Sequence, residues 1–170
     1  MLPIKPHLWF DNQAKEAAEF YTTLMPDSAI NYISQLHNTP SGDCDIVEFT
    51  VAGRSFMAIS AGPLFKFNPS ISFMINFEPS HNPDAALRID NVWSKLVDGG
   101  TVMMALDRYP FSERYGWVAD KYGVSWQITS TLKAEVLKNG TPEQIDRVTQ
   151  AFMPMKKFDV TALQKAYQGE

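Results

Sequence analysis

The most constraining feature of the sequence is a pattern of predicted strands and helices that occurs twice. In the first half, runs that are rich in β-branched and aromatic residues, or that alternate apolar and polar residues, predict strands at residues 4–10, 29–36, 45–51 and 55–60. A helix is predicted after the first strand. In the second half, comparable runs predict strands at residues 70–77, 101–106, 115–119 and 124–129, again with a helix after the first. The order β-α-β-β-β, repeated within 170 residues, predicts two similar modules of an α+β fold.

Each predicted helix has one apolar stripe, so each is expected to cover one face of a sheet. Asp11 or Asn12 is the expected N-cap of the first helix, and Asn82-Pro83-Asp84 is a start signal for the second. The stripe of the first helix consists of Ala14, Ala17, Ala18, Tyr21 and Leu24. That of the second consists of Ile89, Val92, Trp93 and Leu96, before the stop signal Gly99-Gly100.

Short connections that contain glycine predict two hairpins, one turning at residues 52–54 and one at residues 120–123. In the second, Gly123 can adopt a positive φ and Asp120 can accept hydrogen bonds from the turn. The polar stretch at residues 37–43 is expected to be a turn or loop, with Cys44 beside it, and that at residues 107–113 a loop. Residues 131–170 predict a helical extension, with helices at 132–138, from Thr141-Pro142-Glu143, and after a cap at Asp159.

Composition narrows the function classes. The net charge of −4 and the pI near 5.4 argue against a nucleic-acid partner. Cys44 is the single cysteine, so neither an intrachain disulfide nor a multi-cysteine metal site is expected. The chain has no apolar run of about 20 residues, and its first residues lack the apolar core of a signal peptide, so a cytoplasmic protein without a membrane partner is expected.

The last predicted strand has one apolar and one polar face. Trp126 and Ile128 point to one side, whereas Ser125, Gln127 and Thr129 point to the other. If each helix covers one face of its sheet, the remaining faces, with His7, Ser72 and Gln127, are expected to line one shared cavity.

Paired β-α-β-β-β modules resemble the vicinal oxygen chelate superfamily, which includes glyoxalase I and extradiol dioxygenases. Specific runs are similar to its PhnB-like branch, described as 3-demethylubiquinone-9 3-methyltransferase domain proteins. These runs are residues 7–11 (HLWFD), 17–21 (AAEFY), 26–28 (PDS), 56–63 (FMAISAGP), 65–68 (FKFN), 71–73 (ISF), 116–128 (GWVADKYGVSWQI) and 153–157 (MPMKK). The resemblance implies one domain at 1–130, with modules at 1–62 and 70–130, followed by the extension at 131–170. It also implies a homodimer, with which the apolar extension is compatible.

Metal-using members of the superfamily hold a divalent ion with His, Glu or Gln side chains from the strands. By position, His7 matches one such ligand, and Gln127 stands where the last strand usually provides Glu. Ala58 and Ser60 have the expected parity on their strand, and Ser70 and Ser72 on theirs, but neither pair is a good ligand set. An imidazole, an amide and hydroxyls make a poor metal site, so no metal cofactor is expected, with His7 and Gln127 as the candidates if one binds.

The expected function is therefore the binding of a small organic molecule in a concave site, by a binding protein or a metal-independent enzyme. Trp9, Phe65, Phe67, Trp117 and Tyr122 are candidate aromatic walls, with Lys66 and Arg114 as candidate charges. The candidate ligand-binding residues are His7, Trp9, Ser60, Phe65, Lys66, Ser72, Trp117, Tyr122 and Gln127.

Two alternatives remain open. One is a metal-dependent enzyme of glyoxalase or dioxygenase type. The other is the methyltransferase that the family description names, although the glycine-rich turn of a Rossmann-type S-adenosylmethionine site does not occur in the sequence.

Overall fold

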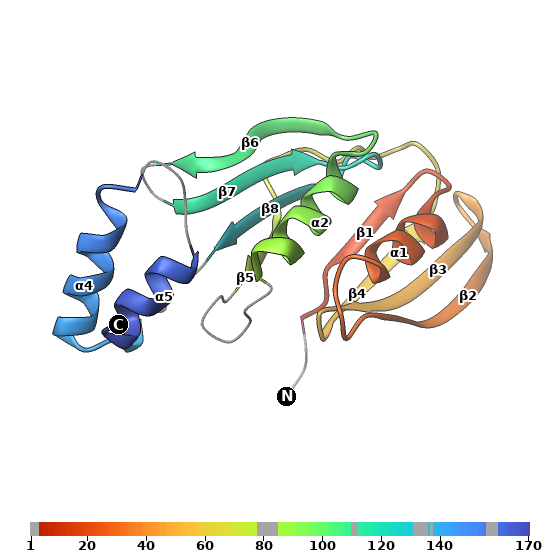
Figure 1. Ribbon diagram of the computed structural model, residues 1–170. Helices are drawn as coiled ribbons and strands as arrows, with labels where there is room; N and C mark the ends of the chain where they lie inside the picture. The colour runs from red at the N-terminus through yellow and green to blue at the C-terminus, as the bar shows by residue number, and fades with distance from the viewer. Residues whose placement is uncertain (1–3, 78–84, 110–111, 131–135, 137, 156–159) are drawn as a thin grey trace. The chain divides into compact units, whose positions relative to one another are not determined.

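A computed structural model describes residues 4–77, 85–109, 112–130, 136, 138–155 and 160–170 (Figure 1). The chain divides into two compact units. Unit 1 comprises residues 1–69 together with Tyr122–Val124, and unit 2 comprises Ser70–Lys121 together with residues 125–170. The turn at residues 122–124 thus belongs to the unit formed by the first half of the chain, and the C-terminal helices belong to unit 2.

Unit 1 contains a four-stranded mixed sheet and one helix. In chain order the elements are β1 (His7–Phe10), α1 (Ala14–Thr22), β2 (Ala29–Thr39), β3 (Gly42–Val51) and β4 (Arg54–Ser60). The strand order is β1-β4-β3-β2, with β1 parallel to β4 and the other neighbours antiparallel. The predicted β-α-β-β-β order of the first half is confirmed.

The core of unit 1 lies between α1 and one face of this sheet. The predicted stripe of α1 is confirmed, because Ala14, Ala17, Ala18, Tyr21 and Leu24 are all buried. The sheet residues of this core are Leu8, Phe10, Val47, Phe49 and Ala58, also buried. The small alanines allow α1 to approach the sheet closely, and burial of each large side chain contributes about 1.5–3 kcal/mol.

The predicted cap of α1 was wrong. Its N-cap is Gln13, whose side chain makes no capping hydrogen bond. Instead, the backbone N–H of Ala14 donates to Ser60 Oγ at 3.0 Å. A hydroxyl at the end of β4, far along the sequence, thus satisfies a free N–H at the helix start, and local sequence cannot reveal such a partner.

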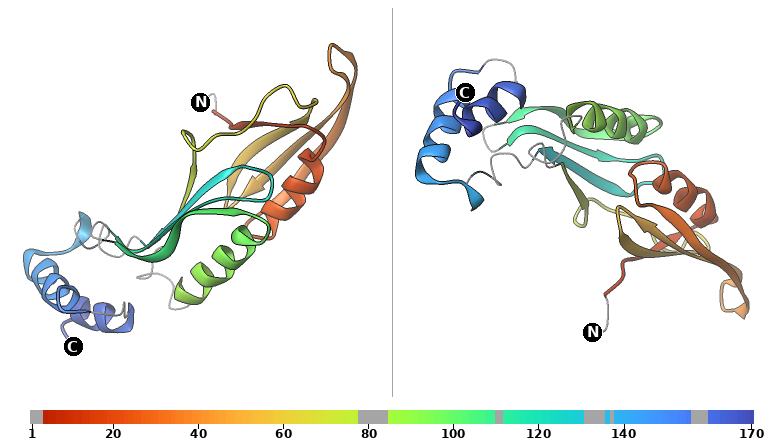
Figure 2. Two further views of the ribbon diagram at one scale, coloured as in Figure 1. Left: turned by 90° about the horizontal axis from the view of Figure 1, so that it is seen from above. Right: turned by 60° about the horizontal axis from the view of Figure 1, so that its bottom comes forward.

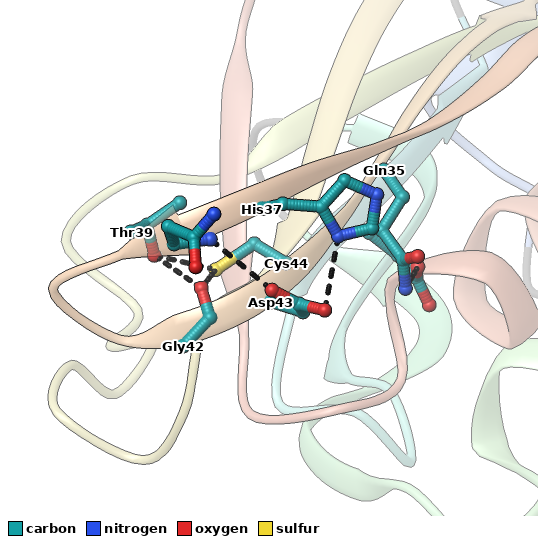
Figure 3. A network of polar contacts seen from close by, with 8 residues as sticks. Gln35, His37, Thr39, Gly42, Asp43 and Cys44 are labelled. Atoms are coloured by element: carbon teal, nitrogen blue, oxygen red, sulfur yellow. Dashed lines mark hydrogen bonds and ion pairs between the residues drawn. The ribbon is translucent and has the colours of Figure 1, made fainter.

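The turn predicted at residues 37–43 is shorter than expected: it is confined to residues 40–41, and the rest of the stretch continues two strands. β2 extends to Thr39 and β3 begins at Gly42, with side-chain hydrogen bonds across the tip (Figure 3). His37 Nδ1 lies 2.9 Å from Asp43 Oδ2, and this contact holds the pKa of Asp43 below its usual value. Cys44 is a buried residue of β3, 3.3 Å from Thr39 Oγ1.

Unit 2 repeats the arrangement. Its elements are β5 (Phe73–Phe77), α2 (Ala85–Val97), β6 (Thr101–Tyr109), β7 (Ser112–Ala119) and β8 (Ser125–Ser130). The strand order is β5-β8-β7-β6, and β5 is parallel to β8. In both units the first strand is therefore parallel to the last. The predicted α+β fold of paired modules is confirmed, each module having one helix beside its sheet (Figure 2).

The helix-facing side of this sheet is apolar, as predicted. Trp126, Ile128 and Val118 are buried, as are the stripe residues Ile89, Val92 and Leu96 of α2. The Trp93 ring lies against Gly116, so close that a Cβ there would be 2.5 Å from Cζ3.

Two predicted strand boundaries in unit 2 were wrong: β5 begins at Phe73 instead of residue 70, and most of the predicted loop at 107–113 belongs to β6 and β7. The start signal at residues 82–84 lies outside the described residues.

The C-terminal helices α4 (Pro142–Phe152) and α5 (Val160–Gln168) pack on each other around Val136, Val148 and Leu163. The predicted start of α4 is confirmed, because Thr141 and Gln144 form a reciprocal capping box. Arg108 of β6 reaches this extension, donating to the carbonyl of Met155 and lying 4.5 Å from the Phe152 ring centre. The predicted helix at 132–138 falls largely outside the described residues, and Asp159 entirely so. No helix in the described part of the chain combines the length and hydropathy needed to cross a membrane.

Candidate functional site

The strand register defines which residues share the face of the unit 1 sheet opposite α1, here called the open face of unit 1. His7 pairs with Met57, and Trp9 pairs with Ile59, so Met57 and Ile59 lie beside them on this face. Ala58 and Ser60 pair with the core residues Leu8 and Phe10. The predicted parity of Ala58 and Ser60 was therefore wrong, and the hydroxyl of Ser60 caps α1 instead.

A charged pair on the open face of unit 1 was missed in the sequence. Glu48 pairs with Met57, which places it in the cross-strand row of His7. Its Oε1 lies 2.7 Å from Lys5 Nζ, and its side chain is only 17% exposed. The hydrogen bond from Lys5 is the largest cause that holds the pKa of Glu48 below its usual value. The sequence alone does not single out Glu48, because its partner Lys5 is 43 residues away and local sequence patterns do not extend over such a separation.

A pocket of about 210 Å³ opens in unit 1 beyond the end of β1. It is lined by Trp9, Phe10, Asp11, Gln13, Phe65, Lys66, Phe67, Tyr122 and Gly123. Four of the predicted ligand-binding residues, Trp9, Phe65, Lys66 and Tyr122, thus come together from three separate segments. Phe67, a further aromatic residue of the lining, was predicted as a wall as well.

Edge-to-face contacts hold the aromatic walls in place. The ring centres of Trp9 and Phe65 are 5.0 Å apart at 84°, and those of Phe10 and Phe67 are 5.1 Å apart. The Trp9 indole N–H donates to the carbonyl of Gly62 at 2.9 Å, which fixes the ring. Tyr122 contacts the ring of Phe10 and donates to Glu16 Oε1 at 2.6 Å.

The polar groups of the pocket lie at its exposed rim. Lys66 provides an ammonium group, Asp11 a carboxylate, and Gln13 an amide. Gly123 has φ of 85°, a conformation that favours glycine, and a Cβ there would be 3.8 Å from Phe67 Cβ. The turn packs against Phe67 and completes the wall, and the positive φ, not lack of space, is what favours glycine there.

A second polar group of side chains lies on the face of the unit 2 sheet opposite α2. Tyr115 Oη donates to Gln127 Oε1 at 2.8 Å, and Gln127 Nε2 donates to Ser72 Oγ at 2.6 Å. Burial is the largest cause that raises the pKa of Tyr115 above its usual value, with the Tyr109 phenol as a further cause. Trp117, the cross-strand partner of Gln127, donates its indole N–H to Ser125 Oγ at 2.8 Å.

These residues do not fit the divalent metal that the superfamily implies. Met57 lies between His7 and Glu48 in their cross-strand row, and Ile59 pairs with Trp9; neither is a ligand for a hard cation. The oxygen of Gln127 already accepts from Tyr115, and an uncharged amide is a weak metal ligand. Among the described residues, no three His, Cys, Asp or Glu side chains gather closely enough to hold an ion.

The remaining candidates are divided between the units. His7 is an exposed residue of unit 1, whereas Ser72, Trp117 and Gln127 belong to unit 2, so their shared cavity stays a prediction. Arg114, predicted as a pocket charge, forms an ion pair with Asp90 of α2.

Comparison with known proteins agrees with this architecture. The family model of 3-demethylubiquinone-9 3-methyltransferase matches residues 3–129. A solved PhnB protein from Bacillus cereus, which carries the same family description, is 36% identical over 76% of this chain and 99% of its own, with a TM-score of 0.65. A comparison with curated proteins gave no match.

More distant structures share the fold alone. A protein from Pseudomonas aeruginosa is 20% identical over 76% of this chain and 98% of its own, with a TM-score of 0.62. A glyoxalase/bleomycin resistance protein/dioxygenase domain from Frankia is 11% identical over 76% of this chain and 92% of its own, with a TM-score of 0.52. The glyoxalase/bleomycin resistance protein/dioxygenase domain thus shares the fold of this chain. This chain belongs to the 3-demethylubiquinone-9 3-methyltransferase family.

Proposed function

We propose that the protein binds a small organic acid with a single aromatic ring in the pocket of unit 1, without a metal ion. The observation that carries this proposal is the gathering of Trp9, Phe65, Phe67 and Tyr122 around one lysine, Lys66, in a single pocket. Ligand sites are commonly apolar clefts with a few convergent polar groups, and this pocket has that character.

The aromatic lining supports a flat ligand. Trp9 and Phe65 present their rings to the pocket in a fixed edge-to-face arrangement, 5.0 Å apart. A planar ring can stack or pack edgewise on either of them, and such a contact contributes about 0.5–1.5 kcal/mol beyond the burial of its area. The volume of about 210 Å³ is below the roughly 300 Å³ at which drug-sized sites begin, which supports a ligand of one ring.

The charged side chains at the rim favour a ligand with a carboxylate group and determine which way the ligand is oriented. Lys66 is the cation among the lining residues and can pair with a carboxylate. Asp11 is the acid on the same rim and would repel a ligand carboxylate, so the carboxylate is expected at Lys66. Because Lys66 is exposed, the ion pair is expected to add at most about 1 kcal/mol, and the ring to provide most of the affinity.

Calorimetric titration of the full chain with benzoate tests the proposal. Phe65 is 59% exposed, so Phe65→Ala should keep the fold while weakening benzoate roughly three- to tenfold. Leu64, its neighbour, is 72% exposed and lies outside the pocket lining, and Leu64→Ala is the matched control. Lys66→Met should weaken benzoate by up to about fivefold, whereas Lys15→Met on the surface of α1 should not.

Benzylamine has the same ring with the opposite charge and is the control ligand. Equal affinity for benzylamine and benzoate would contradict the proposed pairing of Lys66 with the ligand carboxylate. The absence of benzoate binding, or the same loss in Leu64→Ala as in Phe65→Ala, would contradict the proposed site.

Methyl transfer, named in the family description, is the second candidate. It predicts saturable heat on titration with S-adenosylmethionine. The first helix starts after the glycine-free turn Asp11-Asn12-Gln13, which lacks the close backbone approach that a dinucleotide-type cofactor site uses. We therefore expect no heat from S-adenosylmethionine at concentrations where benzoate saturates.

A further inference from the structure

We propose that Gln127 and Ser72 form a paired-donor site for one oxygen atom of a ligand carboxylate or carbonyl group. The observation behind this inference is the hydrogen-bonded chain Tyr115–Gln127–Ser72 on the face of the unit 2 sheet opposite α2. The inference does not depend on the pocket of unit 1.

The chain of hydrogen bonds fixes the Gln127 amide. The oxygen of the amide accepts from the Tyr115 hydroxyl at 2.8 Å, and its nitrogen donates to Ser72 Oγ at 2.6 Å. Reversal of the amide would place its N–H₂ against the phenol hydroxyl and its oxygen against Ser72. A phenol hydroxyl can donate or accept, so it is the donor role of Tyr115 in this structure, and not its burial, that sets the orientation of the amide.

Two donors remain at the Ser72 end of the chain. The Ser72 oxygen accepts from Gln127, so its own hydrogen must point elsewhere. The Gln127 nitrogen has a second hydrogen as well. Within the described residues, neither hydrogen has an acceptor in the protein. Because the two heavy atoms are 2.6 Å apart, a single oxygen can accept from both at once.

The surroundings favour an acceptor over a cation. Gln127 lies between its cross-strand partners Met74 and Trp117, which present apolar surface. None of Ser72, Met74, Tyr115, Trp117 and Gln127 carries a charge at neutral pH, so a bound cation would have no counter-ion among them. In a partly apolar site, hydrogen bonds from neutral donors to a carboxylate are stronger than they are in water.

An amide at this position provides a donor that a carboxylate does not. A glutamate at residue 127 could still accept from Tyr115 and Ser72, but it would present a negative charge and no donor. Glutamine keeps the shape and reverses the hydrogen-bonding character of one end. Gln127→Glu is therefore a nearly isosteric test of the inference.

The test is a titration of ¹⁵N-labelled full-length protein with sodium acetate at constant ionic strength, observed at the Gln127 side-chain amide. Gln127→Glu removes this resonance and so assigns it. Acetate has no ring and does not need the aromatic pocket, so this experiment can succeed or fail independently of the proposed function. We expect saturable downfield shifts with acetate and none with methylammonium.

Variants make the result specific. Ser72→Ala should weaken acetate about tenfold, since a hydrogen bond to a charged group is lost. Ser94→Ala, on the exposed side of α2, should leave the affinity unchanged. Tyr115→Phe keeps the ring and leaves the amide less firmly oriented, so a loss of about two- to fivefold is expected. Dispersed spectra confirm that each variant is folded.

Three results would overturn the inference. One is the absence of a saturable acetate shift at Gln127 in the folded wild-type protein. Another is an equal loss in Ser72→Ala and Ser94→Ala. The third is selective broadening of the Gln127 amide by substoichiometric Mn²⁺, which would make residue 127 a metal ligand.

Discussion

Ala52 adopts an uncommon backbone conformation in the turn between β3 and β4. Its φ is 47° and that of Gly53 is 72°, as in the tight turns that favour Asn-Gly. An alanine in this left-handed region costs about 1–2 kcal/mol. We expect Ala52→Asn to raise the free energy of unfolding by about 0.5–1 kcal/mol, measured by urea denaturation.

The control uses the same position. Ala52→Val should lower the free energy of unfolding, because a β-branched residue tolerates positive φ poorly. The backbone N–H of Ala52 donates to Ser28 Oγ at 3.0 Å, and neither substitution removes that bond. If Asn and Val shift the stability in the same direction, the turn conformation is not as described.

Glu48 makes unit 1 sensitive to acid. Its pKa in the folded protein lies below the ordinary value of 4.5, chiefly because Lys5 donates a hydrogen bond to it. A lowered folded pKa stabilises the protein fully above the unfolded pKa, and this contribution is lost as the pH falls through the folded pKa. The urea midpoint of the wild-type protein should therefore decrease more steeply below about pH 5 than that of Glu48→Gln.

Lys5→Met should give the same flattened profile, because it removes the donor that lowers the pKa. A double variant should add nothing to either single change. Parallel pH profiles for wild-type protein and Glu48→Gln would contradict the role of this ion pair.

Single residues also mark the limit of what the sequence could reveal about the site. Trp9, Phe65, Lys66 and Tyr122 could be proposed because ligand sites in such folds are apolar clefts with few polar groups. Ser60 was placed on the wrong face, since its partner Ala14 is 46 residues away. Glu48 was missed because only the register of three strands brings it into the row of His7.

For helices and strands, the periodicity of apolar residues predicted correctly which faces are buried. The polarity of a stretch predicted the ends of strands wrongly. The alanine stripe of α1 and the alternation of β8 follow directly from the sequence, because burial imposes their periods. The polar runs at 37–43 and 107–113 were read as turn or loop segments. In the structure His37 and Asp43 contact each other across the β2–β3 hairpin, and Ser112 Oγ lies 3.0 Å from Thr129 Oγ1 of the neighbouring strand β8. Polarity in these two stretches therefore does not mark a loop.

Arg108 connects the C-terminal helices to β6. It donates to the Met155 carbonyl and lies over the Phe152 ring at 4.5 Å. Arg108→Met should lower the opening free energy of α4 by roughly 1–2 kcal/mol, measured by amide hydrogen exchange within α4. Arg88→Met, at an exposed position of α2, is the matched control. Unchanged exchange in α4 of Arg108→Met would show that packing between α4 and α5 alone holds the extension.

At the scale of the whole molecule, the repeated pattern was the most informative part of the sequence. It predicted both sheets. In each unit the first strand of the sheet pairs in parallel with the last. It did not predict that residues 122–124 belong with unit 1, because that depends on the packing of Tyr122 against Phe10, Phe20 and Tyr21.

The central claim is that this family member binds an organic acid without a metal. The most direct measurement is the affinity of benzoate for EDTA-treated protein, compared with the same protein after addition of equimolar Zn²⁺ or Mn²⁺. We expect saturable binding in the metal-free protein and the same affinity after either addition, with Phe65→Ala weakened in all three conditions. Benzoate binding that occurs only after a metal is added would contradict it.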